Sequence, residues 1–207
     1  MTRPLLDRMA KRALDIVGSA GGVVVLSPLL VALSIWVRLD SAGPALFRQE
    51  RVGRGGRLFR IHKFRTMRVA CRSESAGALT IGADARITGA GVFLRRTKLD
   101  ELPQLIDVLL GDMSLVGPRP EVPHYVAGYP DDVRAAVLSV RPGITDVASL
   151  TFSDESDLLA RAADPEREYR EVVLPAKLRL STQYLQQATV ASDLRLIVRT
   201  LKTIFVA

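Results

Sequence analysis

An uninterrupted apolar run near the N-terminus is the feature that most constrains this chain. Residues 16–37 read IVGSAGGVVVLSPLLVALSIWV and carry no charged side chain over 22 residues, which as a helix would span roughly 33 Å. The run is too long for the apolar part of a cleaved signal peptide, and basic residues follow it directly. We therefore expect residues 1–40 to form a membrane segment with an interfacial N-terminus.

Ser27 and Pro28 lie near the middle of this run. Pro28 removes a backbone donor and crowds the preceding turn, so it predicts a kink or break, and the Ser27 hydroxyl can bond a freed carbonyl. Each arm would then cover about half of the hydrocarbon thickness. Basic residues flank the run on both sides and favour the cytoplasm for both ends. The sequence thus favours a re-entrant helix–break–helix, with a kinked single-pass anchor as the open alternative. The flanking basic residues are Arg3, Arg8, Lys11 and Arg12 before the run, and Arg38, Arg48, Arg51, Arg54, Arg57 and Arg60 after it.

The composition excludes several classes of protein. The 207 residues suit one ordinary domain, which we expect to occupy residues 41–207. A hydrophobic content of 48% is too high for a disordered basic tail, although the net charge is +7. The single cysteine, Cys71, excludes an internal disulfide, and two histidines leave no cluster for structural zinc.

The positive charge is concentrated directly after the apolar run. Residues 38–72 hold ten lysines and arginines and two acidic residues. This basic segment could bind anionic head groups or a lipid-borne phosphate, or it could form a charged edge exposed to solvent. Within this segment, residues 45–64 read ALFRQERVGRGGRLFRIHKF and predict a short basic β-hairpin with a turn at residues 53–56. Lys63 and Arg65 flank Phe64 at the end of the hairpin and can point together.

Asp100 and Glu101 are adjacent acids beside a basic cluster that includes Arg95 and Arg96. A helix that begins near Asp100 leaves Pro103 in the tolerated first turn and ends at residue 111, a glycine. Adjacent carboxylates diverge on a helix, so one can attack phosphorus while the other holds a divalent cation. Acidic residues in a first turn also stabilise the helix dipole alone. Spacing by itself leaves both interpretations open.

Two arginines stand in proline-containing turns downstream. Arg119 lies between two prolines in Gly-Pro-Arg-Pro, which stiffens its backbone and presents a forked donor suited to phosphate. Arg141 precedes Pro-Gly and is a weaker signal, since this pattern is first of all typical of a turn. Both are candidates for substrate binding.

Taken together, these motifs resemble the bacterial monotopic phosphoglycosyl transferases, the polyprenyl-phosphate sugar-phosphate transferases. The resemblance covers most of the chain, and the segment from DELPQL to GPRP is its most specific part. The matching segments are KRALDIVGSAGGVVVLSPLL, FRQERVGRGGRLFRIHKFRTM, RTKLDELPQLIDVLLGDMSLVGPRP, RPGIT and, more weakly, SDLRLIVRTL.

The resemblance implies a fold and a reaction. The fold would be a mostly helical α+β unit on the cytosolic face of the bacterial inner membrane, with a re-entrant helix turned at Ser27 and Pro28. The enzyme would transfer a sugar 1-phosphate from a UDP-sugar to polyprenyl phosphate and release UMP, without nucleic acid as a partner and with an oligomer possible. Asp100 would be the nucleophile and Glu101 would bind Mg²⁺. The residues expected to bind substrate are Lys63, Arg65, Arg95, Arg96, Arg119 and Arg141.

The chain also departs from the family pattern at two places. After RPGIT many relatives continue with Gly and a Trp/Ala-Gln-Val stretch, whereas this chain has Asp146 to Leu150. Ahead of Tyr184 an acidic residue is expected in many members, and this chain has Ser181. These departures bear on donor recognition, and the sequence does not identify the sugar. Two functions from other classes stay open, a membrane-bound module that binds nucleic acid or anionic lipid and a catalytically dead scaffold.

Overall fold

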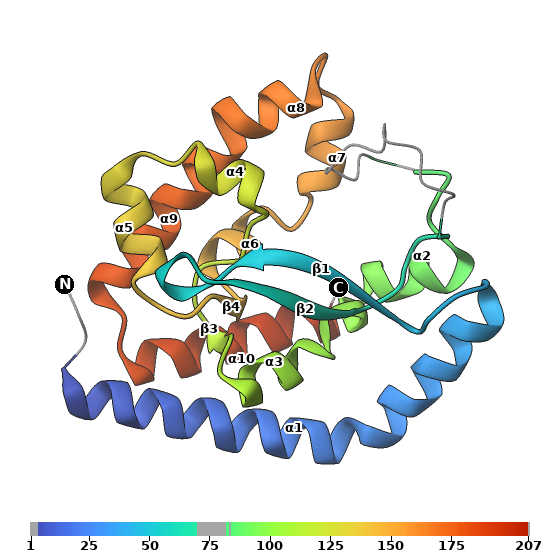
Figure 1. The fold of residues 1–207 in the computed structure, drawn as a ribbon, viewed down its shortest axis with the longest axis horizontal. Coiled ribbons are helices and arrows are strands. Elements are labelled where there is room, and N and C mark those ends of the chain that lie inside the picture. Colours follow the sequence, from blue (N-terminus) through green and yellow to red (C-terminus); the bar gives the residue numbers. More distant parts are fainter. Residues whose placement is uncertain (1–3, 70–81, 83, 207) are drawn as a thin grey trace.

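The computed structural model describes residues 4–69, 82 and 84–206, so that Cys71 and the basic Arg72 lie outside the described residues. Helices dominate, and the described strands form an antiparallel pair, β1 and β2, and a parallel pair, β3 and β4 (Figure 1). The prediction of a mostly helical α+β unit is confirmed. The elements in chain order are α1 (Leu5–Asp40), β1 (Leu46–Val52), η1 (Arg54–Gly56), β2 (Leu58–Phe64), α2 (Gly89–Arg96), η2 (Leu99–Glu101), α3 (Gln104–Leu110), β3 (Ser114–Val116), α4 (Pro123–Ala127), α5 (Asp131–Leu138), β4 (Gly143–Thr145), α6 (Val147–Thr151), α7 (Glu155–Ala160), α8 (Pro165–Glu168), η3 (Tyr169–Val173), α9 (Leu174–Gln187) and α10 (Val190–Val206).

The apolar run belongs to α1, which continues through Pro28 as one helix. Pro28 has no N–H for the carbonyl of Val24, and the Ser27 hydroxyl donates to that carbonyl instead, at 2.8 Å. The ribbon changes direction about midway along α1 (Figure 1). The expected kink is therefore present, but it is a bend inside one helix rather than a break between two, because Ser27 replaces the lost hydrogen bond.

Most of α1 is not covered by the rest of the protein. Over its most apolar 18-residue window the mean hydropathy is 2.2 and 11% of the residues are buried, and it is the one described helix long and apolar enough to cross a membrane. Its first part contacts α3, β3 and α10, and Leu33 and Val37 of its second part pack on Phe64 and Leu94. Both ends of α1 are therefore attached to the same body. Its large exposed apolar side chains are Leu5, Leu6, Met9, Ile16, Val17, Val24, Val25, Leu29, Val31, Ile35, Trp36 and Leu39.

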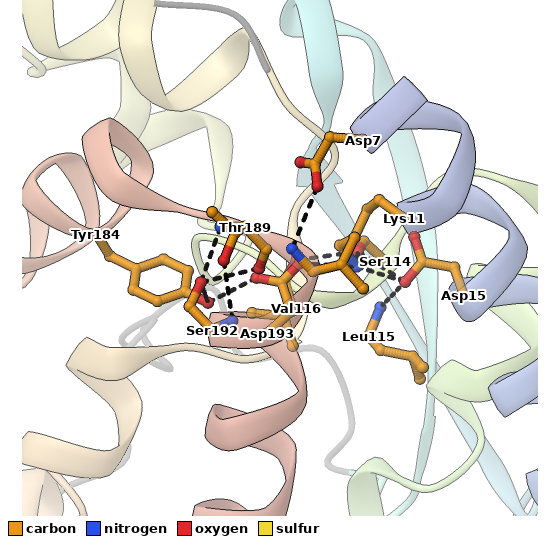
Figure 2. Close-up of polar contacts among 11 residues, drawn as sticks. Asp7, Lys11, Asp15, Ser114, Leu115, Val116, Tyr184, Thr189, Ser192 and Asp193 are labelled. Carbon is orange, nitrogen blue, oxygen red and sulfur yellow. Dashed lines mark hydrogen bonds and ion pairs between the residues drawn. The ribbon is translucent and has the colours of Figure 1, made fainter. Parts of the chain in front are cut away.

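A buried polar cluster fastens the N-terminal part of α1 to the body (Figure 2). Lys11 Nζ lies 2.5 Å from Asp15 Oδ1 and donates to Ser114 Oγ of β3, also at 2.5 Å. It also lies 3.8 Å from Asp193 Oδ2 of α10, while Tyr184 of α9 donates to Asp193 Oδ1 at 2.6 Å. Asp15 and Asp193 are 2% and 0% exposed. A buried charge costs free energy unless it is paired, so this cluster fixes which face of α1 meets the body.

The predicted hairpin is present as β1 and β2, paired from Leu46 with Phe64 to Val52 with Leu58. Residues 55 and 56 of its turn are glycines with positive φ values of 69° and 80°, which non-glycine residues rarely adopt. His62 of β2 joins the hairpin to α3: its backbone N–H donates to Asp107 Oδ2 at 2.8 Å, and Nδ1 lies 2.6 Å from Asp107 Oδ1. This contact attaches β2 to the middle of α3.

The helix predicted to begin near Asp100 begins as a single 3-10 turn, η2, followed by α3. Pro103 occupies the N-cap position of α3, where its missing N–H costs nothing, and residue 111 is a glycine with φ of 90° that ends the helix as expected. Lys98 precedes η2 with φ of 57°, the one described residue other than glycine with a positive φ. This left-handed residue separates α2 from the turn that carries Asp100.

Strands β3 and β4 bring the Gly-Pro-Arg-Pro loop beside the chain after residue 141. The backbone N–H of residue 117 donates to the carbonyl of Thr145 at 3.1 Å, and that of residue 143 donates to the carbonyl of Pro118 at 2.9 Å. Residues 117 and 143 are glycines, and a Cβ on Gly143 would lie 2.7 Å from the Cα of Gly117. The two segments approach each other so closely that only glycine fits at positions 117 and 143.

Candidate active site

Asp100 forms the centre of the candidate site. Its side chain is 2% exposed, and Oδ2 lies 2.7 Å from the Nζ of Lys63 at the end of β2. Oδ1 is buried and has no hydrogen-bond partner in the described part of the chain. A buried carboxylate oxygen without a partner is expensive in a folded protein. Asp100 therefore has one oxygen held by a cation and one buried oxygen whose hydrogen-bonding capacity is unused.

Glu101 lies next to Asp100 and is held by cations from two other segments. Arg119 donates from both terminal nitrogens to its two carboxylate oxygens, one of them at 3.1 Å, and Lys63 Nζ lies 3.5 Å from Oε1. Burial alone would raise the pKa of Glu101, but the positive charges of Arg119 and Lys63 outweigh it and hold this pKa well below its ordinary value. The same ion pair raises the pKa of Arg119. Glu101 is therefore ionised and Arg119 fully charged throughout the neutral range.

The structure brings Asp100, Glu101, Lys63 and Arg119 together from three separate segments. Lys63 comes from the hairpin, the two acids from η2, and Arg119 from the loop after β3. The exposed fractions of the Lys63 and Arg119 side chains are 22% and 34%. Both cations thus reach the surface and can meet an anionic substrate while they contact the acids.

Arg65 lies elsewhere, although it is two residues from Lys63. It is 3% exposed, and its terminal nitrogens donate to the backbone carbonyls of Val37, Ser41 and Ala42 at 2.9, 2.6 and 2.8 Å. These carbonyls lie at the C-terminal end of α1, where helix geometry leaves them without partners. Arg65 therefore caps α1, and its assignment to substrate binding stays a prediction.

The other predicted arginines, Arg95, Arg96 and Arg141, have different surroundings. Arg95 donates from Nε to Thr66 Oγ1 at 2.8 Å; burial lowers its pKa, and the negative charge of Asp100 opposes this shift. Arg96 is exposed at the end of α2. Arg141 donates from Nε to the carbonyl of residue 111 at 2.7 Å, at the C-terminal end of α3. Arg95 thus belongs to the surroundings of Asp100, whereas Arg141 caps a helix.

The carboxylate next to Asp100 is the candidate ligand for a divalent cation. Mg²⁺ binds proteins through one or two carboxylates and takes its remaining ligands from water and substrate phosphates, and the ionised Glu101 is a donor of this kind. Among the described residues no three His, Cys, Asp or Glu side chains gather to hold a metal without a substrate. Both oxygens of Glu101 are engaged by Arg119. Glu101 would therefore become free to bind a metal when a substrate phosphate replaces it as the partner of Arg119.

Glu121 is a positioning residue that the sequence pattern did not single out. It follows the Gly-Pro-Arg-Pro loop, is 9% exposed, and accepts a hydrogen bond from Tyr169 at 2.8 Å. Arg51 of β1 lies 3.5 Å from Oε2 of Glu121, and Lys177 of α9 lies 3.8 Å from Oε1. The only signal in the sequence is an acid directly after the second proline. Glu121 holds the loop that carries Arg119 between the hairpin and α9.

The two departures from the family pattern meet in space. Asp146, just after β4, accepts a hydrogen bond from the hydroxyl of Ser181 in α9 at 2.8 Å. They are 3% and 4% exposed. Residues 147–150 of the divergent stretch belong to α6, which packs against α9.

Comparison with known proteins identifies relatives over nearly the whole chain. The model of the bacterial sugar transferase family matches residues 6–207. The UDP-N-acetylgalactosamine-undecaprenyl-phosphate N-acetylgalactosaminephosphotransferase of Aeromonas hydrophila is 35% identical over 94% of this chain and 43% of its own length. The UDP-glucose:undecaprenyl-phosphate glucose-1-phosphate transferase of Caulobacter vibrioides is 37% identical over 95% of this chain and 70% of its own length.

A third relative, the undecaprenyl-phosphate galactose phosphotransferase of Salmonella typhimurium, is 39% identical over 73% of this chain and 34% of its own length. The names of the three relatives specify three different sugars. The chain spans less than half the length of several curated relatives that it matches. Because the family model covers almost every residue, the chain belongs to the bacterial sugar transferase family.

Proposed function

We propose that this protein transfers a sugar 1-phosphate from a UDP-sugar to undecaprenyl phosphate, with Asp100 as the covalent nucleophile. The observation that carries the proposal is the state of the Asp100 carboxylate: it is buried, fixed by Lys63 through Oδ2, and unpartnered at Oδ1. The names of the relatives add the donor and the acceptor. Asp100 is thus oriented by one oxygen and reactive at the other.

In the first step, Oδ1 of Asp100 attacks the phosphorus that bears the sugar. A bond forms between this oxygen and phosphorus, the bond from phosphorus to the bridging oxygen of the diphosphate breaks, and UMP leaves with that oxygen. In the second step, an oxygen of undecaprenyl phosphate attacks the same phosphorus and the Asp100 carboxylate is released. The product is undecaprenyl-diphosphate sugar. The burial of Asp100 limits the access of water, which would otherwise hydrolyse the intermediate.

The cations around the two acids would bind the diphosphate of the donor. Arg119 presents a forked guanidinium suited to phosphate oxygens, and Lys63 holds Asp100 while it reaches the surface. Mg²⁺ held by Glu101, and by phosphate oxygens of the donor, would neutralise part of the diphosphate charge. Glu101 is ionised at neutral pH and therefore ready to bind a cation when Arg119 turns to the donor.

We further propose that α1 enters the cytosolic leaflet as a re-entrant helix. Its exposed side chains are largely apolar. Both of its ends contact the rest of the protein. A helix that ran along the membrane normal could not do this, because its ends would lie on opposite sides of the bilayer. Helix α10, which contacts α1, exposes Leu194, Val198 and Leu201 on one face. These positions fit an interfacial helix. Asp100 would then lie where a soluble nucleotide sugar and a lipid phosphate can both arrive.

The test measures UMP release from a panel of UDP-sugars in the presence of undecaprenyl phosphate and Mg²⁺, with mass spectrometry of the intact protein. We expect release with at least one donor, a mass increase of one sugar phosphate when the acceptor is omitted, and loss of both in Asp100→Asn. Undiminished turnover in Asp100→Asn would remove Asp100 from the role of nucleophile. The absence of UMP release with every donor, together with salt-sensitive binding of nucleic acid or anionic vesicles, would favour a binding module instead.

A further inference from the structure

The contact between Asp146 and Ser181 lies directly behind the loop that carries Arg119. The two residues are 35 positions apart in the chain, and the hydrogen bond between them is buried. On one side, Asp146 continues β4, whose residues bond the backbone of residue 117 and Pro118. On the other side, Ser181 belongs to α9, the long helix that also carries Lys177 beside Glu121. The pair thus connects the arginine loop to α9.

Backbone groups, rather than cations, surround the Asp146 carboxylate. Burial raises the pKa of Asp146, while the Ser181 hydroxyl and the backbone N–H groups of Ala148, Arg119 and Val147 favour its charged form. Within the described residues, no lysine, arginine or histidine forms an ion pair with Asp146. A carboxylate held by N–H dipoles fixes the orientation of the peptides that supply them. One of these N–H groups belongs to Arg119. The neighbouring hydrogen bonds of the loop, from the N–H of residue 117 to the carbonyl of Thr145 and from the N–H of residue 143 to the carbonyl of Pro118, place Asp146 beside the backbone of the residue that binds Glu101.

The backbone on either side of Arg119 has little freedom to adjust. The glycines at positions 117 and 143 leave no room for a side chain between β3 and β4. Pro118 and Pro120 restrict the backbone on both sides of Arg119. A small rotation of the Arg119 peptide would therefore be transmitted to the guanidinium, which approaches Glu101 with both terminal nitrogens.

We propose that Asp146, paired with Ser181, is a positioning residue that holds the Arg119 peptide so that the guanidinium meets Glu101 and the diphosphate of the donor. The inference rests on the proposed function. Asp146 acts through Arg119 and does not touch the reacting atoms.

The first experiment exchanges the two partners. Asp146→Ala, Ser181→Ala and the double exchange Asp146→Ser with Ser181→Asp are compared by steady-state kinetics of UMP release with the best UDP-sugar. We expect Asp146→Ala to lower kcat/KM by about 10- to 100-fold, mostly through kcat, because a misplaced phosphate-binding group acts on the transition state. Ser181→Ala should lose about tenfold or less, since one hydrogen bond is removed. The double exchange should recover most of the activity. Thr182→Ala is the matched control, because its hydroxyl bonds the carbonyls of Leu178 and Arg179 in its own helix.

The second experiment is a double-mutant cycle with Arg119→Ala. If Asp146 acts through Arg119, then Asp146→Ala in the Arg119→Ala background should lower UMP release by less than twofold. Equal, independent losses in both backgrounds would overturn the proposal, as would a double exchange no better than Asp146→Ala. Should Asp146→Ala fail to fold, as judged by circular dichroism, Ser181→Ala and the exchange variant decide the question. A wild-type protein that releases no UMP from any UDP-sugar would instead refute the proposed function itself.

Discussion

The replacement of Arg65 by methionine discriminates between its predicted role at the substrate and its observed position at the end of α1. Arg65→Met keeps an apolar stem of similar shape but removes the guanidinium and its hydrogen bonds to three backbone carbonyls. A hydrogen bond from a charged group contributes about 1.5 to 3 kcal/mol. The carbonyls of Ser41 and Ala42 lie in a partly exposed turn and can regain water, whereas the bond to Val37 is buried. We therefore expect a loss of about 2 to 4 kcal/mol in the free energy of unfolding.

For a protein of this size, that loss corresponds to a decrease in Tm of about 4 to 16 °C. The assay is thermal unfolding followed by circular dichroism in one detergent, with UMP release measured at a temperature where both proteins are folded. Arg179→Met on the exposed side of α9 is the control and should shift Tm by less than about 2 °C. An unchanged Tm combined with a large rise in KM for the UDP-sugar would refute the capping role and support the prediction that Arg65 binds substrate.

Three further predictions concern the site and the close contact between residues 117 and 143. Lys63→Met should lower kcat of UMP release by about 100-fold or more, because it removes the cation from a buried carboxylate, and Lys63→Arg should retain part of the activity. The lowered pKa of Glu101 means that its ion pair stabilises the protein fully above the ordinary pKa of 4.5 and progressively less as the pH falls below it. The Tm difference between wild type and Glu101→Gln should therefore be largest above pH 4.5 and narrow in acid, and a difference independent of pH would contradict this. Gly143→Ala should cost about 1 to 3 kcal/mol in chemical unfolding because its Cβ would collide with Gly117, whereas Gly21→Ala, with nothing within 4 Å, should cost nothing.

Local chemistry made several parts of this fold predictable from the sequence. The glycine-rich turn and the alternating residues of the hairpin, the glycine that ends α3, and the bend at Pro28 with its Ser27 hydrogen bond all depend on residues close together in the chain. Asp100 and Glu101 were candidates because they lie beside a basic cluster, and only the resemblance to the family assigned them catalytic roles. The structure pairs these acids with Lys63 and Arg119, and the roles of all four residues stay predictions.

Long-range contacts limited the prediction for the rest of the site. Arg65 lies just past the end of β2, where strand alternation no longer determines its direction, and the end of α1 that it caps comes from another part of the chain. Arg141 similarly caps α3, 30 residues away. Nothing in the local pattern indicated that Asp146 and Ser181 would meet, since their contact depends on how α9 packs beside β4.

The attachment of α1 at both ends has a mechanical consequence. Lys11 and Asp15 fix one end of the helix to β3 and α10, and Arg65 fixes the other end beside the hairpin. In a bilayer, α1 therefore cannot tilt or rotate on its own, and any change in its angle would turn the whole protein. If α1 enters one leaflet as proposed, the depth of Asp100 relative to the lipid phosphates would depend on the thickness and curvature of that leaflet. Under the proposed function, the physical state of the membrane would then set how readily the lipid acceptor reaches the aspartate.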